Sequence, residues 1–153
     1  MKVALVPVAA HDYDAYFALM REYMRELDAF DPSGAESDAD FARRRERTLD
    51  DMDDRELLWI IADGERAGLL MVRSDPRWVN PDETVASISE FYVLPEFRRR
   101  GVGTAAVEAL LAEHRGRGTA EMQADILRDN APARAFWARM GFEVQMVLTT
   151  RRP

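Results

Sequence analysis

The spacing of apolar residues along the chain alternates between the period of a helix and that of a strand. Over residues 12–30, apolar side chains recur every three or four positions, which predicts an amphipathic helix with Asp12 as its N-cap. A second, heavily charged helix is expected over about 38–51, with Ser37 or Asp38 as its cap. The chain therefore begins with more helix than strand.

Runs of apolar residues bounded by turn residues predict the strands. The sequence Asp63-Gly64-Glu65-Arg66 is typical of a hairpin turn, and Pro95 ends the longest run. In chain order we expect a strand over 2–9, the two helices, strands over 57–62 and 67–73, a loop over 75–82 followed by a strand to Leu94, a helix over 104–115, a strand over 120–127, a helix over 132–140 and a strand over 142–150.

This order of elements predicts one α/β domain over residues 1–153, with a mixed sheet covered by helices on both faces. No apolar run approaches the roughly 18 residues that a membrane span needs, and the apolar start of the chain is too short for a signal peptide. We expect a cytoplasmic protein with no membrane association.

Cysteine is absent, which excludes disulfides, thiolate metal sites and an acyl-cysteine intermediate. The two histidines, His11 and His114, are far apart and lack the spacing of metal ligands, so no metal is expected.

Charge is distributed unevenly along the chain, which has a net charge of −7. Residues 1–90 carry 11 Lys and Arg against 21 Asp and Glu, a net of −10, and residues 91–153 carry 10 against 7, a net of +3. The first segment suits a cationic ligand and the second a polyanionic one, whereas nucleic acid is a poor partner for an acidic chain. The alternative is that the acidic excess is solvated helix surface.

The sequence Arg98-Arg99-Arg100-Gly101-Val102-Gly103 joins a predicted strand to a predicted helix. Glycine permits positive φ and close approach, so consecutive N–H groups can converge on an anion at the positive end of the helix. The arginines add forked donors that match phosphate oxygens. This turn is a candidate phosphate site.

Two segments resemble motifs of the GCN5-related N-acetyltransferase (GNAT) family, which transfers acetyl groups from acetyl-CoA to amines. Residues Phe91 to Gly103 resemble its strand, proline and pyrophosphate loop, and residues Asn130 to Phe142 resemble its segment of asparagine, small residue, aromatic and Gly-Phe. The resemblance implies a mostly antiparallel twisted sheet, splayed between the strand that ends at Leu94 and the strand over 120–127.

The resemblance also implies where the cofactor binds. Backbone amides of the glycine loop would hold the pyrophosphate, and the backbones of Phe91 and Val93 would pair with the pantetheine arm. Asn130 would form a hydrogen bond with the cofactor, or would only cap the helix that follows it. Ala133 would be small enough to let the cofactor pass close, or would be a helix residue without a special role. The implied cofactor residues are Phe91, Val93, Arg98, Arg99, Arg100, Gly101, Val102, Gly103, Thr104, Asn130, Ala133 and Trp137.

The chain departs from the family pattern at two points. Trp137 stands where the family often has the tyrosine that reprotonates the CoA thiolate. Solvent or Tyr92 would then be the proton donor, because an indole cannot play that role. Trp137 would instead pack against the cofactor or in the core. The sequence ends at Pro153, soon after the last predicted strand, so we expect that a seventh strand is missing or is supplied by a partner subunit in a homodimer.

Glu90 is the candidate general base, three residues before Val93, with an outward, solvated carboxylate as the alternative. A local β-bulge would decide which of Glu90 and Phe91 faces the opening between the two splayed strands. Residues 12–56 would form much of the acceptor wall, with Asp28 and Asp31 as substrate-binding carboxylates.

The sequence thus predicts direct transfer of an acetyl group to a primary amine, on a small molecule or a peptide. A non-catalytic acyl-CoA-binding module is the alternative. A nucleotide-binding domain would need a Gly-Lys-Ser/Thr loop, which the chain lacks.

Overall fold

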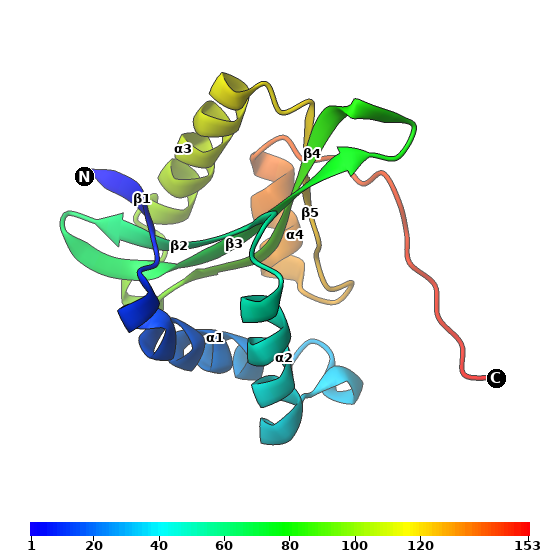
Figure 1. The fold of residues 1–153 in the computed structure, drawn as a ribbon. Helices are drawn as coiled ribbons and strands as arrows, with labels where there is room; N and C mark the ends of the chain where they lie inside the picture. The colour runs from blue at the N-terminus through cyan, green and yellow to red at the C-terminus, as the bar shows by residue number, and fades with distance from the viewer.

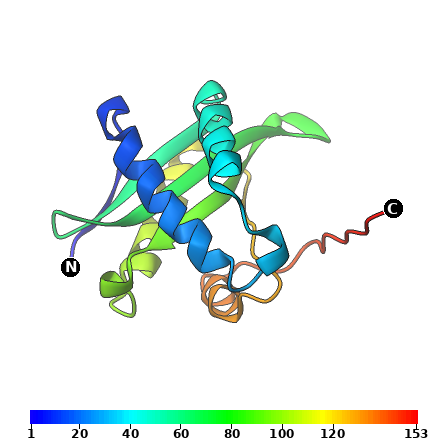
Figure 2. The ribbon, with the colours of Figure 1, turned by 90° about the horizontal axis from the view of Figure 1, so that it is seen from below.

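A mixed five-stranded sheet in the order β1-β2-β3-β4-β5 forms the centre of the protein, as a computed structural model of residues 1–153 shows. All neighbouring strands are antiparallel except β4 and β5, which are parallel. Helices α1 and α2 cover one face, and α3 and α4 cover the other (Figures 1 and 2). The elements are β1 Val3–Pro7, α1 Tyr13–Leu27, α2 Asp38–Asp50, β2 Arg55–Ala62, β3 Glu65–Arg77, β4 Asn80–Val93, α3 Val102–Arg117, β5 Glu121–Ala124 and α4 Ala131–Arg139, with short 3₁₀ turns at Ala10–Asp12, Pro32–Gly34 and Pro95–Phe97. The α/β class expected from the sequence is confirmed.

Each face of the sheet has its own hydrophobic core because side chains alternate along the strands. On one face, Tyr16, Phe17 and Met20 of α1 pack against Trp59 of β2. The buried Tyr16 hydroxyl donates to the carbonyl of Leu70 at 2.8 Å, which satisfies it inside this core. The other core combines β-strand residues with α3 and Trp137 of α4. No helix has both the length and the apolar character needed to cross a membrane.

The sheet opens between β4 and β5. The two strands pair only between Val85–Ile88 and Glu121–Ala124, while β4 continues to Val93 with β3 as its only neighbour. The strand expected over 120–127 is therefore shorter than predicted, because the chain leaves the sheet after Ala124. The result is the splay that the family resemblance predicted.

The prediction of a loop over residues 75–82 is wrong. Strand β3 continues to Arg77 and β4 begins at Asn80, with Pro76 opposite Thr84. Proline and aspartate suggested a loop, but β2 pairs with β3 only as far as Arg73, so Pro76 lies on a free ribbon edge where a missing N–H costs nothing.

The prediction of a final strand over residues 142–150 is also wrong. Phe142 donates its N–H to the carbonyl of Trp137 at 3.0 Å, and no hydrogen bond joins residues 143–153 to the rest of the chain. Figures 1 and 2 both show this segment leaving the body on the side of the sheet away from β1. A strand needs a neighbour for its backbone groups, and this segment has none within the chain.

Candidate active site

A β-bulge in β4 turns Glu90 toward α1 and α2. Glu90 pairs with Met71 and Ile88 pairs with Val72, so Ser89 has no partner on β3. Before the bulge, Ile88 packs in the core beneath α3; strict alternation would have placed Glu90 there too. The extra residue instead places Glu90 and Tyr92 on the face covered by α1 and α2.

The Glu90 carboxylate lies beside a guanidinium that is already engaged elsewhere. Its side chain is only 12% exposed, and its Oε1 lies 3.7 Å from Nη1 of Arg44. Nε of Arg44 donates to both carboxylate oxygens of Glu36, at 2.9 and 3.0 Å. Burial raises the pKa of Glu90 to about 7, with Arg44 acting in the opposite direction and the charges of Glu36 and Asp125 adding to the rise. A carboxylate with this pKa can accept and release a proton near neutral pH.

Two tyrosines lie beside Glu90. Burial and the nearby charge of Glu90 raise the pKa of Tyr23, and its ring packs 5.2 Å from that of Tyr92. The Tyr92 hydroxyl donates to Oε1 of Glu26 at 2.8 Å, and burial together with this carboxylate raises the pKa of Tyr92 to about 12. Tyr92 therefore holds its proton more firmly than an ordinary tyrosine does.

Asp28 and Asp31 line a small cavity that also contains Arg44. Its volume is about 150 Å³, and three carboxylates face a single guanidinium in its wall. Leu127, from the segment after β5, also lines the cavity, which therefore lies beside the place where the chain leaves the sheet at the splay. The lining residues are Met24, Leu27, Asp28, Asp31, Gly34, Glu36, Arg44 and Leu127.

The glycine loop presents a row of unpaired backbone donors. None of the N–H groups from Arg99 to Thr104 donates to an acceptor within the chain. Arg99 and Gly101 adopt left-handed conformations, with φ of 60° and 83°, and Gly101 caps the N-terminus of α3. Alternating left-handed residues turn successive N–H groups to one side, as anion-binding backbone nests require. The backbone therefore fits a phosphate group.

Two of the three arginine side chains of the loop have contacts within the chain. Nε of Arg98 donates to the carbonyl of Val93 at 2.7 Å, and its Nη2 contacts Glu26 at 2.9 Å. Its guanidinium is thus turned toward Glu26 of α1, and a phosphate contact by this side chain stays a prediction. Arg99 is exposed and pairs with no acidic group, whereas Arg100 lies over the ring of Phe97.

The backbone of β4 beyond the bulge faces the open side of the sheet. Leu94 donates its N–H to the carbonyl of Ala67 on β3 at 2.8 Å. Hydrogen-bonding direction alternates along a strand, so the N–H and C=O groups of Phe91 and Val93 point away from β3, on the side of the splay. The Val93 carbonyl is already bound there by Nε of Arg98. Gly103 lies alongside, since a Cβ there would meet the Phe91 ring at 3.6 Å. A long polar ligand can pair with β4 and reach the loop.

The α4 residues have mainly structural contacts. Asn130 caps the helix, with Oδ1 accepting from the N–H of Ala133 at 3.2 Å. Trp137 is 5% exposed and packs against Phe91, whose ring lies 5.3 Å away. Ala133 is partly buried against the same core. Capping and packing, the alternatives left open by the sequence, are therefore present, and direct cofactor contacts by these residues remain predictions.

Arg44, Glu36, Tyr23 and Glu26 were not singled out from the sequence. Arg44 and Glu36 lay in a stretch of mixed charge where many residues look alike, and Tyr23 fitted the apolar face of α1. No local pattern distinguishes Arg44, which acquires its place only when α2 packs over the bulge in β4. Groups of three or more His, Cys, Asp or Glu side chains arranged to hold a metal ion are not found in the structure.

The splayed sheet, the unpaired amides beside it and the buried carboxylate are the features of an acetyltransferase. The model described as "Acetyltransferase (GNAT) family" matches residues 19–142, and the chain belongs to this family.

Individual relatives of the chain are also N-acetyltransferases by name. The chain is 37% identical over 81 residues to an uncharacterised N-acetyltransferase of Methanocaldococcus jannaschii, covering 50% of this chain and only 35% of that longer protein. It is 32% identical over 110 residues to an aminoglycoside N(6')-acetyltransferase type 1 of Stenotrophomonas maltophilia, covering 70% of this chain and 72% of the relative.

The fold is also that of a solved structure, AAC(6')-Iy in complex with the bisubstrate analog CoA-S-monomethyl-acetylneamine. The TM-score is 0.69 at 22% identity, with 100% of this chain and 99% of the other covered.

Proposed function

We propose that this protein transfers an acetyl group from acetyl-CoA to a primary amine on a molecule that carries further positive charge. The observation that carries the proposal is the placement of Glu90. Its buried carboxylate, with a pKa near 7, lies beside a cavity walled by Asp28, Asp31 and Glu36, next to the splay. The aminoglycoside acetyltransferases among the relatives act on acceptors of this chemical class, which supports the proposal.

The donor would lie along β4. The unpaired N–H groups from Arg99 to Thr104 would hold its pyrophosphate, and the backbones of Phe91 and Val93 would pair with its amide-bearing arm, with Arg98 releasing the Val93 carbonyl where that group is needed. When bound, acetyl-CoA supplies a thioester whose carbonyl carbon the amine attacks, forming the C–N bond while the C–S bond breaks.

The reaction needs two proton transfers, one from the amine and one to the departing thiolate. An amine is protonated at neutral pH and must lose a proton before it can attack. Glu90 would accept that proton, directly or through a water, and its raised pKa matches this task. Solvent would protonate the departing thiolate, because the Tyr92 hydroxyl is bound to Glu26 and Trp137 is buried among aromatic rings. The acidic cavity would orient the acceptor by its remaining charges.

A non-catalytic acyl-CoA-binding module is the second candidate, favoured by the tryptophan at position 137. Release of free thiol from acetyl-CoA, measured over a panel of amines that differ in charge, separates the two. Turnover that is fastest with polycationic amines supports the proposed enzyme. Tight acetyl-CoA binding without thiol release from any amine would instead support the module.

A further inference from the structure

Trp78 differs from the other tryptophans of the chain because it lies in solvent. It is 96% exposed, whereas Trp59 and Trp137 are 4% and 5% exposed. Together with Val79 it forms the turn between β3 and β4, and the outer end of this ribbon extends beyond α2 (Figures 1 and 2). Among aromatic side chains, the face of the tryptophan ring attracts cations most strongly. The tip of the ribbon therefore presents a surface suited to a positively charged group.

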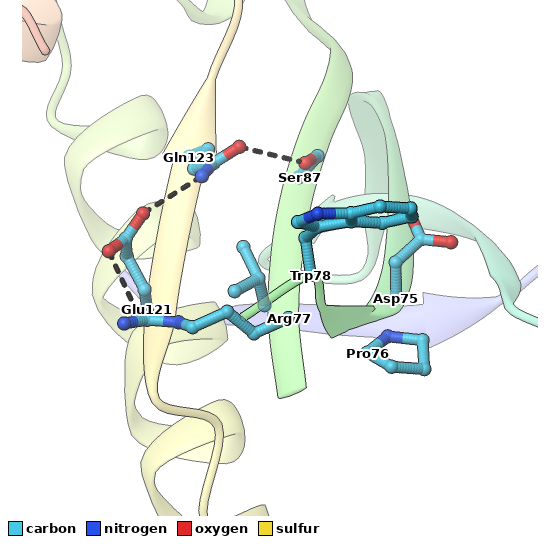
Figure 3. A pocket seen from close by; sticks show the side chains of 8 residues that line it. Asp75, Pro76, Arg77, Trp78, Ser87, Glu121 and Gln123 are labelled. Atoms are coloured by element: carbon cyan, nitrogen blue, oxygen red, sulfur yellow. Dashed lines mark hydrogen bonds and ion pairs between the residues drawn. The ribbon is translucent and has the colours of Figure 1, made fainter. Parts of the chain in front are cut away.

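A cavity lies beside the Trp78 ring. Its volume is about 350 Å³, and Figure 3 shows the side chains that line it, from the β3–β4 ribbon and from Glu121 and Gln123 of β5. Strands β4 and β5 form its floor, because Val85 pairs with Glu121 and Ser87 pairs with Gln123 in the parallel register. Three strands thus build the cavity, and the indole lies at its rim.

The charges around this cavity favour a cation. Arg77 contacts Glu83 at 3.2 Å and Glu121 at 3.0 Å, so one guanidinium is shared between two carboxylates and one negative charge is left over. The third carboxylate, Asp75, is paired with an arginine of β3 at 3.1 Å. A cation between the Glu121 carboxylate and the Trp78 ring would be stabilised by both.

The cavity and Glu90 lie on the same face of the sheet. Ile88 packs in the core beneath α3, so Ser87, one residue earlier, points to the opposite face, where the bulge also places Glu90. Along β4, Glu90 is three residues from Ser87 and five from Val85. At about 3.3 Å per residue, the cavity lies roughly 10–15 Å from Glu90.

A row of polar side chains on β5 connects the two places. Glu121 and Gln123 line the cavity, and Asp125, two residues further on, is exposed and pairs with no basic group. Asp125 lies close enough to Glu90 for its charge to add to the rise in the pKa of that carboxyl. A ligand that begins at Glu90 can therefore follow β5 past Asp125 into the cavity.

We propose that the acceptor is an elongated oligoamine: while its reacting amine lies at Glu90, a second ammonium group roughly 10–15 Å away lies in the cavity between Glu121 and the Trp78 ring. This inference rests on the proposed function and adds a length requirement to it. The cavity of Asp28 and Asp31 would take charges nearer to the reacting amine, whereas the Trp78 cavity would measure the distance to a remote one.

The first experiment measures kcat/KM for α,ω-diamines of increasing length, with thiol release from acetyl-CoA as the readout. We expect a rise where the two nitrogen atoms are roughly 10–15 Å apart, and no such rise for amino alcohols of the same lengths, because a neutral hydroxyl gains little from the indole face. An equal rise for the amino alcohols, or a kcat/KM that does not depend on length, overturns the proposal.

Substitutions in the cavity should remove this preference. Trp78→Ala and Glu121→Gln should each lower the ratio of kcat/KM between the favoured and a short diamine about fivefold, and Trp78→Phe, which keeps a ring face, should lower it less. The matched controls are Val79→Ala, in the same turn, and Glu65→Gln, an exposed change of equal charge at the β2–β3 turn. A ratio that neither Trp78→Ala nor Glu121→Gln lowers overturns the proposal.

The second experiment does not depend on turnover. Quenching of tryptophan fluorescence by acrylamide reports chiefly on Trp78, because Trp59 and Trp137 are buried. The favoured diamine should shield the indole at concentrations at which a short diamine does not, with Trp78→Ala as the background. Unchanged quenching overturns the cation site. Shielding without thiol release from any amine would instead contradict the proposed function and leave the cation site in place.

Discussion

Arg44 lies 3.7 Å from Glu90 but commits its guanidinium to Glu36. The geometry leaves Arg44 able to stabilise the Glu90 carboxylate only in part, and burial prevails over it to hold the pKa of Glu90 near 7. A closer ion pair would keep Glu90 ionised with an ordinary or lowered pKa and would make it a weaker base. The arrangement thus balances a buried carboxylate between the neutral and ionised forms.

Glu90→Gln should lower kcat/KM by about 10²- to 10⁴-fold at neutral pH, the contribution usual for a general base. The wild-type rate should rise with pH through about 7 as Glu90 ionises, whereas the variant should recover only at the higher pH at which the amine deprotonates unaided. Profiles of kcat/KM against pH test this. Glu22→Gln, an exposed change on α1 with the same charge difference, should leave the profile intact; an unchanged profile for Glu90→Gln would contradict the assignment.

The same substitution should stabilise the fold at alkaline pH. A carboxyl whose folded pKa is raised from 4.5 to about 7 binds its proton more tightly in the folded state, so stability falls as pH rises between these values. One pKa unit is worth about 1.4 kcal/mol, so ionised Glu90 costs on the order of 3 kcal/mol above pH 7. Denaturant unfolding at pH 5 and pH 8 should show wild type weakening with pH and Glu90→Gln weakening less.

Gly101→Val should abolish CoA binding without unfolding the protein. Valine is strained at a φ of 83°, by about 1–2 kcal/mol, and relief of that strain would turn the amides of the loop out of line. Gly118→Val is the matched control, because Gly118 has a φ of 78° at the opposite end of α3, with open space around it. Calorimetry should show lost binding for Gly101→Val alone, while thermal unfolding shows similar destabilisation of both. Wild-type affinity in Gly101→Val would place the pyrophosphate elsewhere.

Asp31→Asn should lower kcat/KM for a polycationic amine about fivefold, corresponding to about 1 kcal/mol for one solvated charge pair, and should hardly affect an amine without further charge. The preference for the cationic amine should also shrink with added salt, since screening shortens the field to about 8 Å at physiological ionic strength. Asp50→Asn, an exposed change at the end of α2, is the control. A preference that neither salt nor Asp31→Asn alters would mean that the acidic wall is ordinary solvated surface.

Trp137→Phe should cost stability, on the order of 1–2 kcal/mol, with the single-turnover rate preserved. Its indole packs against Phe91, Phe136 and Phe142 and is remote from proton transfer. Tyr92→Phe should likewise lose the bond to Glu26 and leave the chemical step unchanged. Rapid-quench measurements at saturating acetyl-CoA test both, and a large drop for either variant with unchanged CoA affinity would identify that residue as the proton donor.

Local patterns predicted much of the fold. The apolar spacing of α1, the Ser37 cap of α2 and the hairpin turn at Asp63 and Gly64 depend on neighbours within a few residues, and all are present. The glycine loop was found for the same reason, because its conformation is set by Gly101 and the start of α3.

Features that depend on distant neighbours could not be predicted in the same way. The β3–β4 ribbon forms despite Pro76, since no third strand needs its missing N–H. Residues 143–150 are strand-like in sequence but unpaired in the structure. In the candidate site, the sequence suggested Glu90, but its facing depended on a bulge that pairing with β3 reveals. Arg44 had no local signature at all.

The single unpaired residue Ser89 divides β4 into two halves of opposite phase. The first half, from Val85 to Ile88, joins the sheet to β5, and the second carries the carboxylate and the outward-facing backbone. Deleting one residue at this point would keep every side chain of the second half and yet exchange the environments of Glu90 and Phe91, placing the carboxylate among the aromatic rings of α4. In the evolution or redesign of this chain, insertions and deletions at Ser89 are therefore more consequential than almost any substitution nearby, because they change which side of the sheet performs chemistry.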